Sequence, residues 1–314
     1  MTTDTLIEAR RLSRMYGNNV AVSELNLTLG KGEILGLLGP NGAGKTTTMR
    51  MLTGCLAPSG GEVRINGISL ADDPAGAKRS LGYLPEKPPV YPELTVNEYL
   101  GYCAGLHGIP GHAREAAVAK AAEACGLTQV AHRLIGNLSK GYQQRVGLAQ
   151  AIIHRPPVII LDEPTVGLDP IQIREIRSLI AELGREHSVI LSSHILPEIQ
   201  AVCSRVMIIN QGRVVYADTM ENAQDGQFDS FRIALSQSAD TAALAAITAV
   251  SSVDELGDNE YRLHHDKDAD PRAELVKLVA DRGWGLLELV PERTTLEEIF
   301  VNLTSGEARP AEAA

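Results

Sequence analysis

The feature that most constrains this chain is the octapeptide GPNGAGKT, which occupies Gly39 to Thr46. It follows the apolar run EILGLL and precedes TTTMRMLTG, a segment that can open a helix. A glycine-rich loop between a buried strand and a helix N-terminus presents its backbone amides to phosphate groups. We therefore predict a phosphate site in an α/β fold, in which Lys45 reaches the β- and γ-phosphates and Thr46 ligates Mg²⁺. The alternative is a glycine-rich turn with chance spacing.

Two further apolar runs extend this frame, and each ends in polar residues. VIILDEP contains Asp162 and Glu163, and SVILSSH ends in His194. Short continuous apolar runs are typical of strands in a parallel sheet that is covered by helices on both faces. Asp162 is then placed to hold Mg²⁺ and Glu163 to polarise a water for attack on a γ-phosphate. The alternative for VIILDEP is an acidic pair that caps a helix. The alternative for His194 is a structural role, since a lone histidine is more often structural than catalytic.

The rest of the pattern divides the chain into parts. Alternating segments from Thr5 to Leu29, together with GEVRING, predict a small antiparallel sheet. From about residue 88 to 155 helical patterns replace the strands, which predicts a helical subdomain inserted into the α/β frame. After a change in composition at ENAQDGQFDS, the order strand, helix, strand, strand, helix, strand predicts a small ferredoxin-like α+β domain. The predicted domains are residues 1–222 and 228–304, followed by a disordered tail at 305–314.

Composition excludes some classes of function. A net charge of −10 argues against a general nucleic-acid binder, whose affinity comes largely from Lys and Arg. The four cysteines form no CxxC pair and predict reduced, mostly buried thiols in a cytoplasmic protein. No signal peptide pattern and no apolar run of about 20 residues occurs, so we expect any membrane role to depend on a partner.

In order and spacing, these motifs resemble those of the ATP-binding subunits of ABC transporters, over about Leu6 to Asp218. GPNGAGKTT is similar to the Walker A loop of that family, VIILDEP to its Walker B strand, TVGLDP to its D-loop and SSH to its switch histidine. NLSKGYQQRV is similar to its signature. The resemblance implies a P-loop NTPase fold of ABC type with ATPase activity. In this family the signature of one subunit covers the γ-phosphate held by another subunit, so a homodimer enclosing two ATP molecules is implied.

The resemblance also implies roles for individual residues. Ser139 and Gly141, at a helix N-terminus, suit contact with an anion, whereas an ordinary helix cap explains Ser139 alone. Tyr16 would stack on adenine beside Val20, and Asp169 would link the two sites across the dimer. The implied ATP-binding set is Tyr16, Val20, Gly39, Asn41, Gly42, Ala43, Gly44, Lys45, Thr46, Thr47, Glu86, Ser139, Gly141 and Asp169. The implied Mg²⁺ ligands are Thr46, Asp162 and Glu86, and the implied catalytic residues are Glu163 and His194.

Two departures from the family pattern stand out. The signature has Lys140 and Tyr142 where Gly and Gln are usual, although Ser139 and Gly141 are retained. Glu86 occupies the position of a Gln that senses Mg²⁺ and the membrane partner. A glutamate can ligate Mg²⁺ but cannot donate a hydrogen bond when it is ionised. We predict that Glu86→Gln remains an ATPase.

These departures and the C-terminal extension resemble the branch of the family that serves separately encoded membrane exporters. We therefore expect a peripheral protein on the inner face of the membrane, bound through a permease by a surface near Tyr91, Pro92, Leu94 and Tyr99; these residues suit a helical core equally well. The rivals are a soluble ABC-type ATPase with a non-membrane partner, and a regulatory module without turnover. His264, His265 and Asp266 suggest a metal site less strongly than a polar surface.

Overall fold

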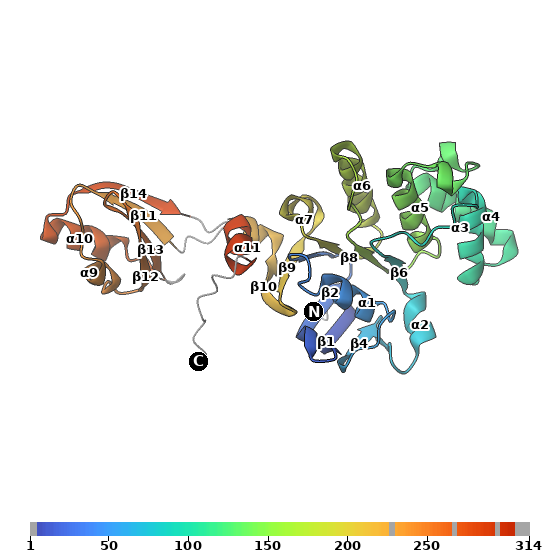
Figure 1. Ribbon diagram of the computed structural model, residues 1–314, viewed down its shortest axis with the longest axis horizontal. Coiled ribbons are helices and arrows are strands. Elements are labelled where there is room, and N and C mark those ends of the chain that lie inside the picture. Colours follow the sequence, from blue (N-terminus) through green and yellow to red (C-terminus); the bar gives the residue numbers. More distant parts are fainter. Residues whose placement is uncertain (1–4, 226–229, 266–268, 293–295, 305–314) are drawn as a thin grey trace. The chain divides into compact units, whose positions relative to one another are not determined.

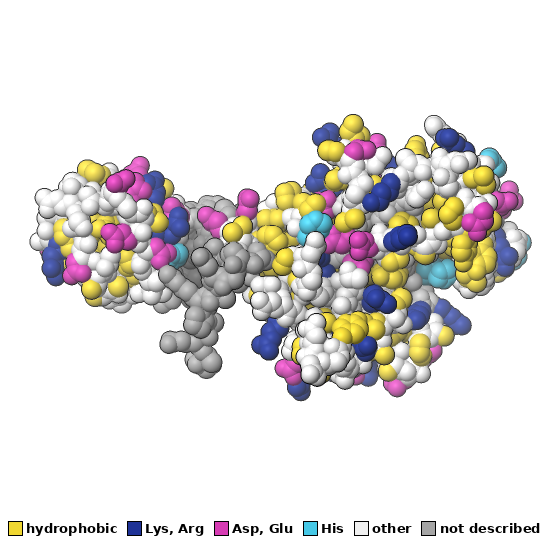
Figure 2. All heavy atoms as spheres, viewed as in Figure 1, with side chains coloured by type: hydrophobic (Ala, Val, Ile, Leu, Met, Phe, Trp, Pro, Cys, Tyr) yellow, Lys and Arg dark blue, Asp and Glu magenta, His cyan; other side chains and the backbone are white. Residues whose placement is uncertain are grey.

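The structure is a computed structural model that describes residues 5–225, 230–265, 269–292 and 296–304 (Figure 1). The chain forms two compact units, Met1–Met220 and Glu221–Ala314, each with its own hydrophobic core. Figure 2 shows basic and acidic side chains interspersed over the visible face of the first unit rather than gathered by sign.

A six-stranded sheet in the order β10-β9-β3-β8-β7-β6 forms the centre of the first unit. Strands β9, β3, β8, β7 and β6 are mutually parallel, and β10 joins the edge antiparallel to β9. The prediction of a parallel sheet from the three apolar runs is therefore confirmed. The bounds are β3 Ile34–Leu38, β6 Leu81–Leu84, β7 Val158–Asp162, β8 Ser188–Ser193, β9 Arg205–Asn210 and β10 Arg213–Thr219.

The pairing of these strands brings their carboxyl ends to one edge. Leu38 at the end of β3 pairs with Ser193 of β8, and Ser192 pairs with Asp162 of β7. Residues that follow these strands therefore lie close together although Leu38 and Ser193 are 155 positions apart in the sequence, and Asp162 and Ser192 are 30 apart.

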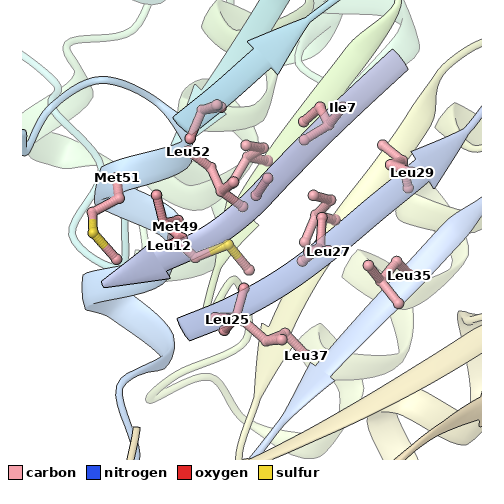
Figure 3. Close-up of a cluster of buried hydrophobic side chains, with 14 of the residues drawn as sticks. Ile7, Leu12, Leu25, Leu27, Leu29, Leu35, Leu37, Met49, Met51 and Leu52 are labelled. Carbon is pink, nitrogen blue, oxygen red and sulfur yellow. The ribbon is translucent and has the colours of Figure 1, made fainter. Parts of the chain in front are cut away.

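A second, antiparallel sheet has the order β2-β1-β4-β5, with β1 Thr5–Tyr16, β2 Asn19–Gly30, β4 Gly60–Ile65 and β5 Ile68–Ser69. Alternate residues of β1 and β2, such as Ile7 and Leu27, point into one core with Leu35 of β3 and with Met49 of α1, which spans Lys45–Leu52 (Figure 3). Period-two alternation is the pattern of a sheet with one buried face, so the antiparallel subdomain follows directly from the sequence.

Helices cover the central sheet and build the inserted block. α3 Val96–Leu106, α4 Gly111–Ala124 and α5 Lys140–Ile152 pack on one another, and α5 also packs on β6. Thr95 and Glu98 form a reciprocal capping box at the start of α3. The other elements are α1 Lys45–Leu52, α2 Pro74–Arg79, η1 Thr128–Val130, η2 Ile135–Asn137, α6 Pro170–Leu183, α7 Leu196–Val202 and α8 Met220–Asp225. Three of the four cysteines are buried, and Cys55 is exposed.

The second unit contains an antiparallel sheet in the order β12-β13-β11-β14, the strand order of a ferredoxin-like unit. Its core includes Phe231, Tyr261, Leu263 and Leu275. Its elements are β11 Ser230–Leu235, α9 Thr241–Ala245, β12 Val250–Gly257, β13 Glu260–His265, α10 Arg272–Arg282, β14 Leu286–Glu292 and α11 Leu296–Thr304.

One helix of this unit is shorter than its pattern predicts. The run TAALAAITAV suggests a helix through residue 250, but α9 ends at Ala245 and β12 begins at Val250. The β-branched residues Ile247, Thr248 and Val250 disfavour helix, and Ala249 takes a left-handed φ of 72° that breaks it.

The histidines of β13 have partners of their own. His264 Nε2 lies 3.0 Å from Asp254 Oδ2, and the His265 ring stacks on Phe231 with centroids 4.8 Å apart. Asp266 lies outside the described residues. Within the described ranges no group of three or more His, Cys, Asp or Glu side chains could hold a metal ion.

Candidate nucleotide-binding site

The glycine-rich loop joins β3 to α1, and two of its glycines are required by close packing. A Cβ at Gly39 would lie 2.3 Å from the Ile209 carbonyl oxygen, and one at Gly44 would lie 2.7 Å from that of Ala21. Gly44 also has φ of 105°, a conformation that residues with side chains rarely adopt. The loop therefore holds its turned shape, with the free amides at the N-terminus of α1 available to an anion.

A pocket of about 470 Å³ opens beside this loop. It is large enough for a small-molecule ligand such as a nucleotide's phosphate tail. The lining comes from the loop with the start of α1, from the segments that follow β6, β7 and β8, and from Ala21 of β2. The lining residues are Ala21, Asn41, Gly42, Gly44, Lys45, Thr46, Thr47, Glu86, Glu163, Val166 and His194.

Glu163 links the two sides of the pocket. Its Oε1 lies 3.2 Å from Lys45 Nζ and its Oε2 lies 2.8 Å from His194 Nδ1. The Lys45 ammonium also donates to the Gly39 carbonyl oxygen at 2.7 Å. The Lys45 and Glu163 side chains are 6% and 7% exposed, so their attraction is little screened by water. Glu163 has φ of 48°, in the left-handed region that residues with a side chain seldom adopt.

Asp162 immediately precedes Glu163, at the end of β7, and is 1% exposed. Its Oδ1 accepts hydrogen bonds from Ser192 Oγ at 2.7 Å and from Thr46 Oγ1 at 3.3 Å. Burial raises the pKa of this carboxyl group, while the two hydroxyl donors favour its charged form. The buried Oδ2 has no hydrogen-bond partner. An unpartnered carboxylate oxygen beside a threonine hydroxyl is a donor set that suits Mg²⁺.

The predicted signature residues line a second pocket of about 290 Å³ in the same unit. Ser139 caps α5 by accepting from the Tyr142 backbone amide, and Asp169 caps α6 by accepting from the amides of Ile171 and Gln172. A Cβ at Gly141 would lie 2.8 Å from Gln172 Cδ, so packing of α5 on α6 already favours glycine there. The lining residues are Ser139, Gly141, Tyr142, Arg145, Asp169, Ile171, Gln172, Glu175 and Ile176.

The structure thus brings most of the predicted residues to two separate pockets with no lining residue in common. Gly39 and Ala43 shape the loop, and Asp162 lies at the end of β7, without lining the pocket. Tyr16 and Val20 lie at the β1–β2 turn, 45% and 46% exposed, and neither lines the pocket. The Arg14 guanidinium instead lies over the Tyr16 ring, 4.8 Å from its centroid.

Sequence reasoning missed three residues around the pocket. Ala21 and Val166 line it, and Ser192 donates to Asp162 while accepting from the Glu163 backbone amide at 2.9 Å. The serine pair that precedes His194 was the available signal for Ser192, since a hydroxyl at the end of a buried strand needs a partner. Val166 lies in the TVGLDP segment, which marked its position, whereas no local signal identifies Ala21.

Comparison with known proteins gives a consistent result. Residues 22–166 match the family model described as ABC transporter. The chain is 34% identical to the bacitracin transport ATP-binding protein BcrA of Bacillus licheniformis, over 96% of this chain and 98% of that protein. It is 31% identical to the linearmycin resistance ATP-binding protein LnrL of Bacillus subtilis, over 97% and 100%. A solved ATP-binding subunit of an ABC transporter superposes with a TM-score of 0.62 at 32% identity, over 69% of this chain and 90% of that one.

Proposed function

Because the chain belongs to the family of ABC transporter ATP-binding proteins, we propose that it hydrolyses ATP to power a membrane exporter. The observation that carries this proposal is the convergence of Lys45, Glu163 and His194 on one pocket at the carboxyl edge of the parallel sheet. The name of one full-length relative refers to bacitracin transport and supports a transport role, and that of the other refers to linearmycin resistance and supports export as the direction.

Glu163 is the proposed general base. Its carboxylate lies in the pocket, 2.8 Å from His194 Nδ1, so the imidazole can hold one oxygen while the other faces an attacking water. Lys45 lies 3.2 Å from the same carboxylate, and the negative charge of a triphosphate competes with Glu163 for this ammonium. Binding of the phosphates therefore draws Lys45 toward them and leaves the Glu163 carboxylate free to take a proton.

Asp162 and Thr46 are the residues that would hold Mg²⁺. The unpartnered buried Oδ2 of Asp162 and the hydroxyl of Thr46 supply oxygen atoms of the required kind, and the exposed Glu86 lines the same pocket. When bound, Mg²⁺ neutralises charge on the phosphate oxygens in the transition state. Ser192 keeps Asp162 in place through its 2.7 Å hydrogen bond.

A second copy of this chain is the proposed partner for the pocket at Ser139 and Gly141. Ser139 at a helix N-terminus offers a hydroxyl and backbone amides to an anion, but this pocket shares no lining residue with that of Lys45. Two copies arranged head to tail would each cover the γ-phosphate held by the other. Asp169, at the start of α6 in the same pocket, would then lie at the interface between the copies.

A permease is the proposed membrane partner, a proposal supported by the relatives named for bacitracin transport and linearmycin resistance. Among the residues that the structure describes, no helix is long and apolar enough to cross a bilayer. Tyr91 and Tyr102 are 44% and 47% exposed, and their ring centroids lie 5.8 Å apart at the surface of the helical block. Tyr99 is 2% exposed and donates to the Pro89 carbonyl oxygen, so it belongs to the core beneath them. Exposed aromatic clusters mark protein interfaces, and we propose this one as the permease contact.

The test is copurification from native membranes. Tagged chain is solubilised in mild detergent with a non-hydrolysable ATP analogue, and the bound proteins are identified by mass spectrometry. We expect a multi-span protein in about equal amount, and its loss with Tyr91→Ala or Tyr102→Ala but not with the control Tyr216→Ala, which changes a tyrosine of β10 that lines neither pocket. Recovery from the soluble fraction alone, without a membrane protein, would overturn the transporter role and leave the ATPase intact.

A further inference from the structure

Glu198 is a buried carboxylate with no part in the mechanism above. It lies in the first turn of α7 and is 4% exposed. Its Oε2 accepts two hydrogen bonds of 2.7 Å, one from Thr165 Oγ1 and one from Ser193 Oγ. Its Oε1 is buried without a hydrogen-bond partner. Among the residues that the structure describes, no Lys, Arg or His side chain forms an ion pair with Glu198.

The two hydroxyls belong to the two loops that hold the proposed catalytic groups. Thr165 lies two residues after Glu163, in a tight turn in which the Val166 amide donates to the Glu163 carbonyl oxygen at 3.2 Å. Ser193 immediately precedes His194, and its hydroxyl also accepts from the Ile195 amide at 3.0 Å. The Ser193 hydroxyl therefore closes a turn around His194 while it binds Glu198.

We infer that Glu198 is a positioning residue that holds the loops of Glu163 and His194 in register through Thr165 and Ser193. One oxygen atom joins both hydroxyls, so neither loop can shift without breaking a bond to the same acceptor. The distance this arrangement sets is that between His194 Nδ1 and Glu163 Oε2, which is 2.8 Å. This inference rests on the ATPase proposed above and assigns it a further residue.

The cost of burying the Glu198 carboxylate argues against a role limited to stabilising the fold. A buried carboxylate without a cation is costly, and an apolar side chain of similar volume is often more stable at such a position. An acidic residue at the third position of a helix commonly bonds the backbone amide at the helix start, which would be a simple cap. The side-chain hydrogen bonds of Glu198 instead go to hydroxyls of two other segments.

The proposed mechanism predicts which substitutions are tolerated. Because both donors share one oxygen, the amide oxygen of Glu198→Gln can accept both bonds and its amide group can occupy the place of the unpartnered Oε1. Glu198→Leu has a similar size and accepts neither bond. Displacement of a reacting group by about 1 Å can lower a rate by about 100-fold. We therefore expect Glu198→Leu to lower kcat by about 10- to 100-fold, and Glu198→Gln to recover most of that loss.

The experiment measures Mg-ATP hydrolysis by the full chain, with the melting temperature and the KM for ATP of each variant. We expect Glu198→Leu to lower kcat while KM stays within about threefold, because no ligand contact is removed. His187→Ala is the matched control: His187 is buried in the same unit, and its ring bonds the Pro156 carbonyl oxygen away from the pocket. It should lower the melting temperature and leave kcat of the folded protein unchanged.

A second pair of variants decides the matter if Glu198→Leu does not fold. Thr165→Ser keeps the hydroxyl and Thr165→Val replaces it at equal size, so only Thr165→Val should lower kcat. Equal kcat for these two variants, or a Glu198→Leu protein that hydrolyses ATP like the wild type, overturns the inference. A wild-type chain that does not hydrolyse Mg-ATP overturns the ATPase itself, which is a distinct result.

Discussion

Replacement of Glu163 by Gln tests whether this carboxylate is the base. The amide is nearly isosteric, so its oxygen can still accept from Lys45 at the observed 3.2 Å and its nitrogen can face His194 at 2.8 Å. The pocket therefore keeps its shape and loses only the charge and basicity of one group. General-base catalysis contributes about 10²- to 10⁴-fold. This range corresponds to about 3–5.5 kcal/mol of transition-state stabilisation.

ATP binding should respond in the opposite direction. Glu163 pairs with the nearly buried Lys45, and removal of its charge leaves the ammonium fully available to phosphates. We expect kcat for phosphate release to fall by about 10²- to 10⁴-fold while the Kd of a fluorescent ATP analogue is unchanged or lower. With Mg-ATP the variant should accumulate as a dimer in light scattering, because closure persists when hydrolysis is slow.

Glu24→Gln is a matched control. Glu24 also has φ of 48° and also pairs with a basic residue, Arg11, but it lies exposed on β2. It should leave kcat unchanged. The reasoning fails if Glu163→Gln keeps kcat within about fivefold of the wild type, or if weaker ATP binding accounts for the entire loss of kcat/KM.

Three further expectations concern other residues. Glu86→Gln should remain a Mg-dependent ATPase in a phosphate-release assay, and complete loss would show that this carboxylate is essential. Gly141→Ala should lower stability by about 1–3 kcal/mol in calorimetry, because its Cβ meets the Gln172 side chain, and the companion change Gln172→Ala should restore the melting temperature. Burial, aided by the stacked ring of His107, lowers the pKa of His154 from 6.5 to about 4. As pH falls from about 6.5 to about 4, the unfolded chain takes up this proton before the folded one, so stability is lost across that window. His154→Gln should flatten the dependence of the melting temperature on pH there, and an unchanged slope would contradict this assignment.

Much of the candidate site could be predicted because its residues follow strands. Gly39–Thr46, Asp162 and His194 each come directly after an apolar run, and parallel strands bring their carboxyl ends to one edge of the sheet. The sheet order places β8 between β3 and β7, so the three segments are neighbours. To predict that these residues meet, it was enough to recognise each apolar run as a strand of a parallel sheet.

Other features could not be predicted, since they depend on contacts between distant segments. The bond from Thr165 to Glu198 spans 33 positions, and although Thr165 begins the TVGLDP segment, Glu198 belongs to none of the motifs quoted above. Tyr16 lies outside the phosphate pocket because the β1–β2 turn and the neighbouring Arg14 set its position. The early end of α9 reflects competition between alanine-rich helix propensity and the strand that begins at Val250.

The sequence by itself predicted the family and a phosphate site, together with the residue types proposed to meet the phosphates, because glycine, lysine and carboxylate spacing encodes phosphate chemistry locally. Only the tertiary structure decided how these groups constrain one another. Glu163 is held at an unfavourable φ between Lys45 and His194, Asp162 keeps one oxygen unpartnered, and Glu198 joins two loops through one atom. These properties arise from burial and strand register, which bring together side chains whose separation along the chain carries no local signal.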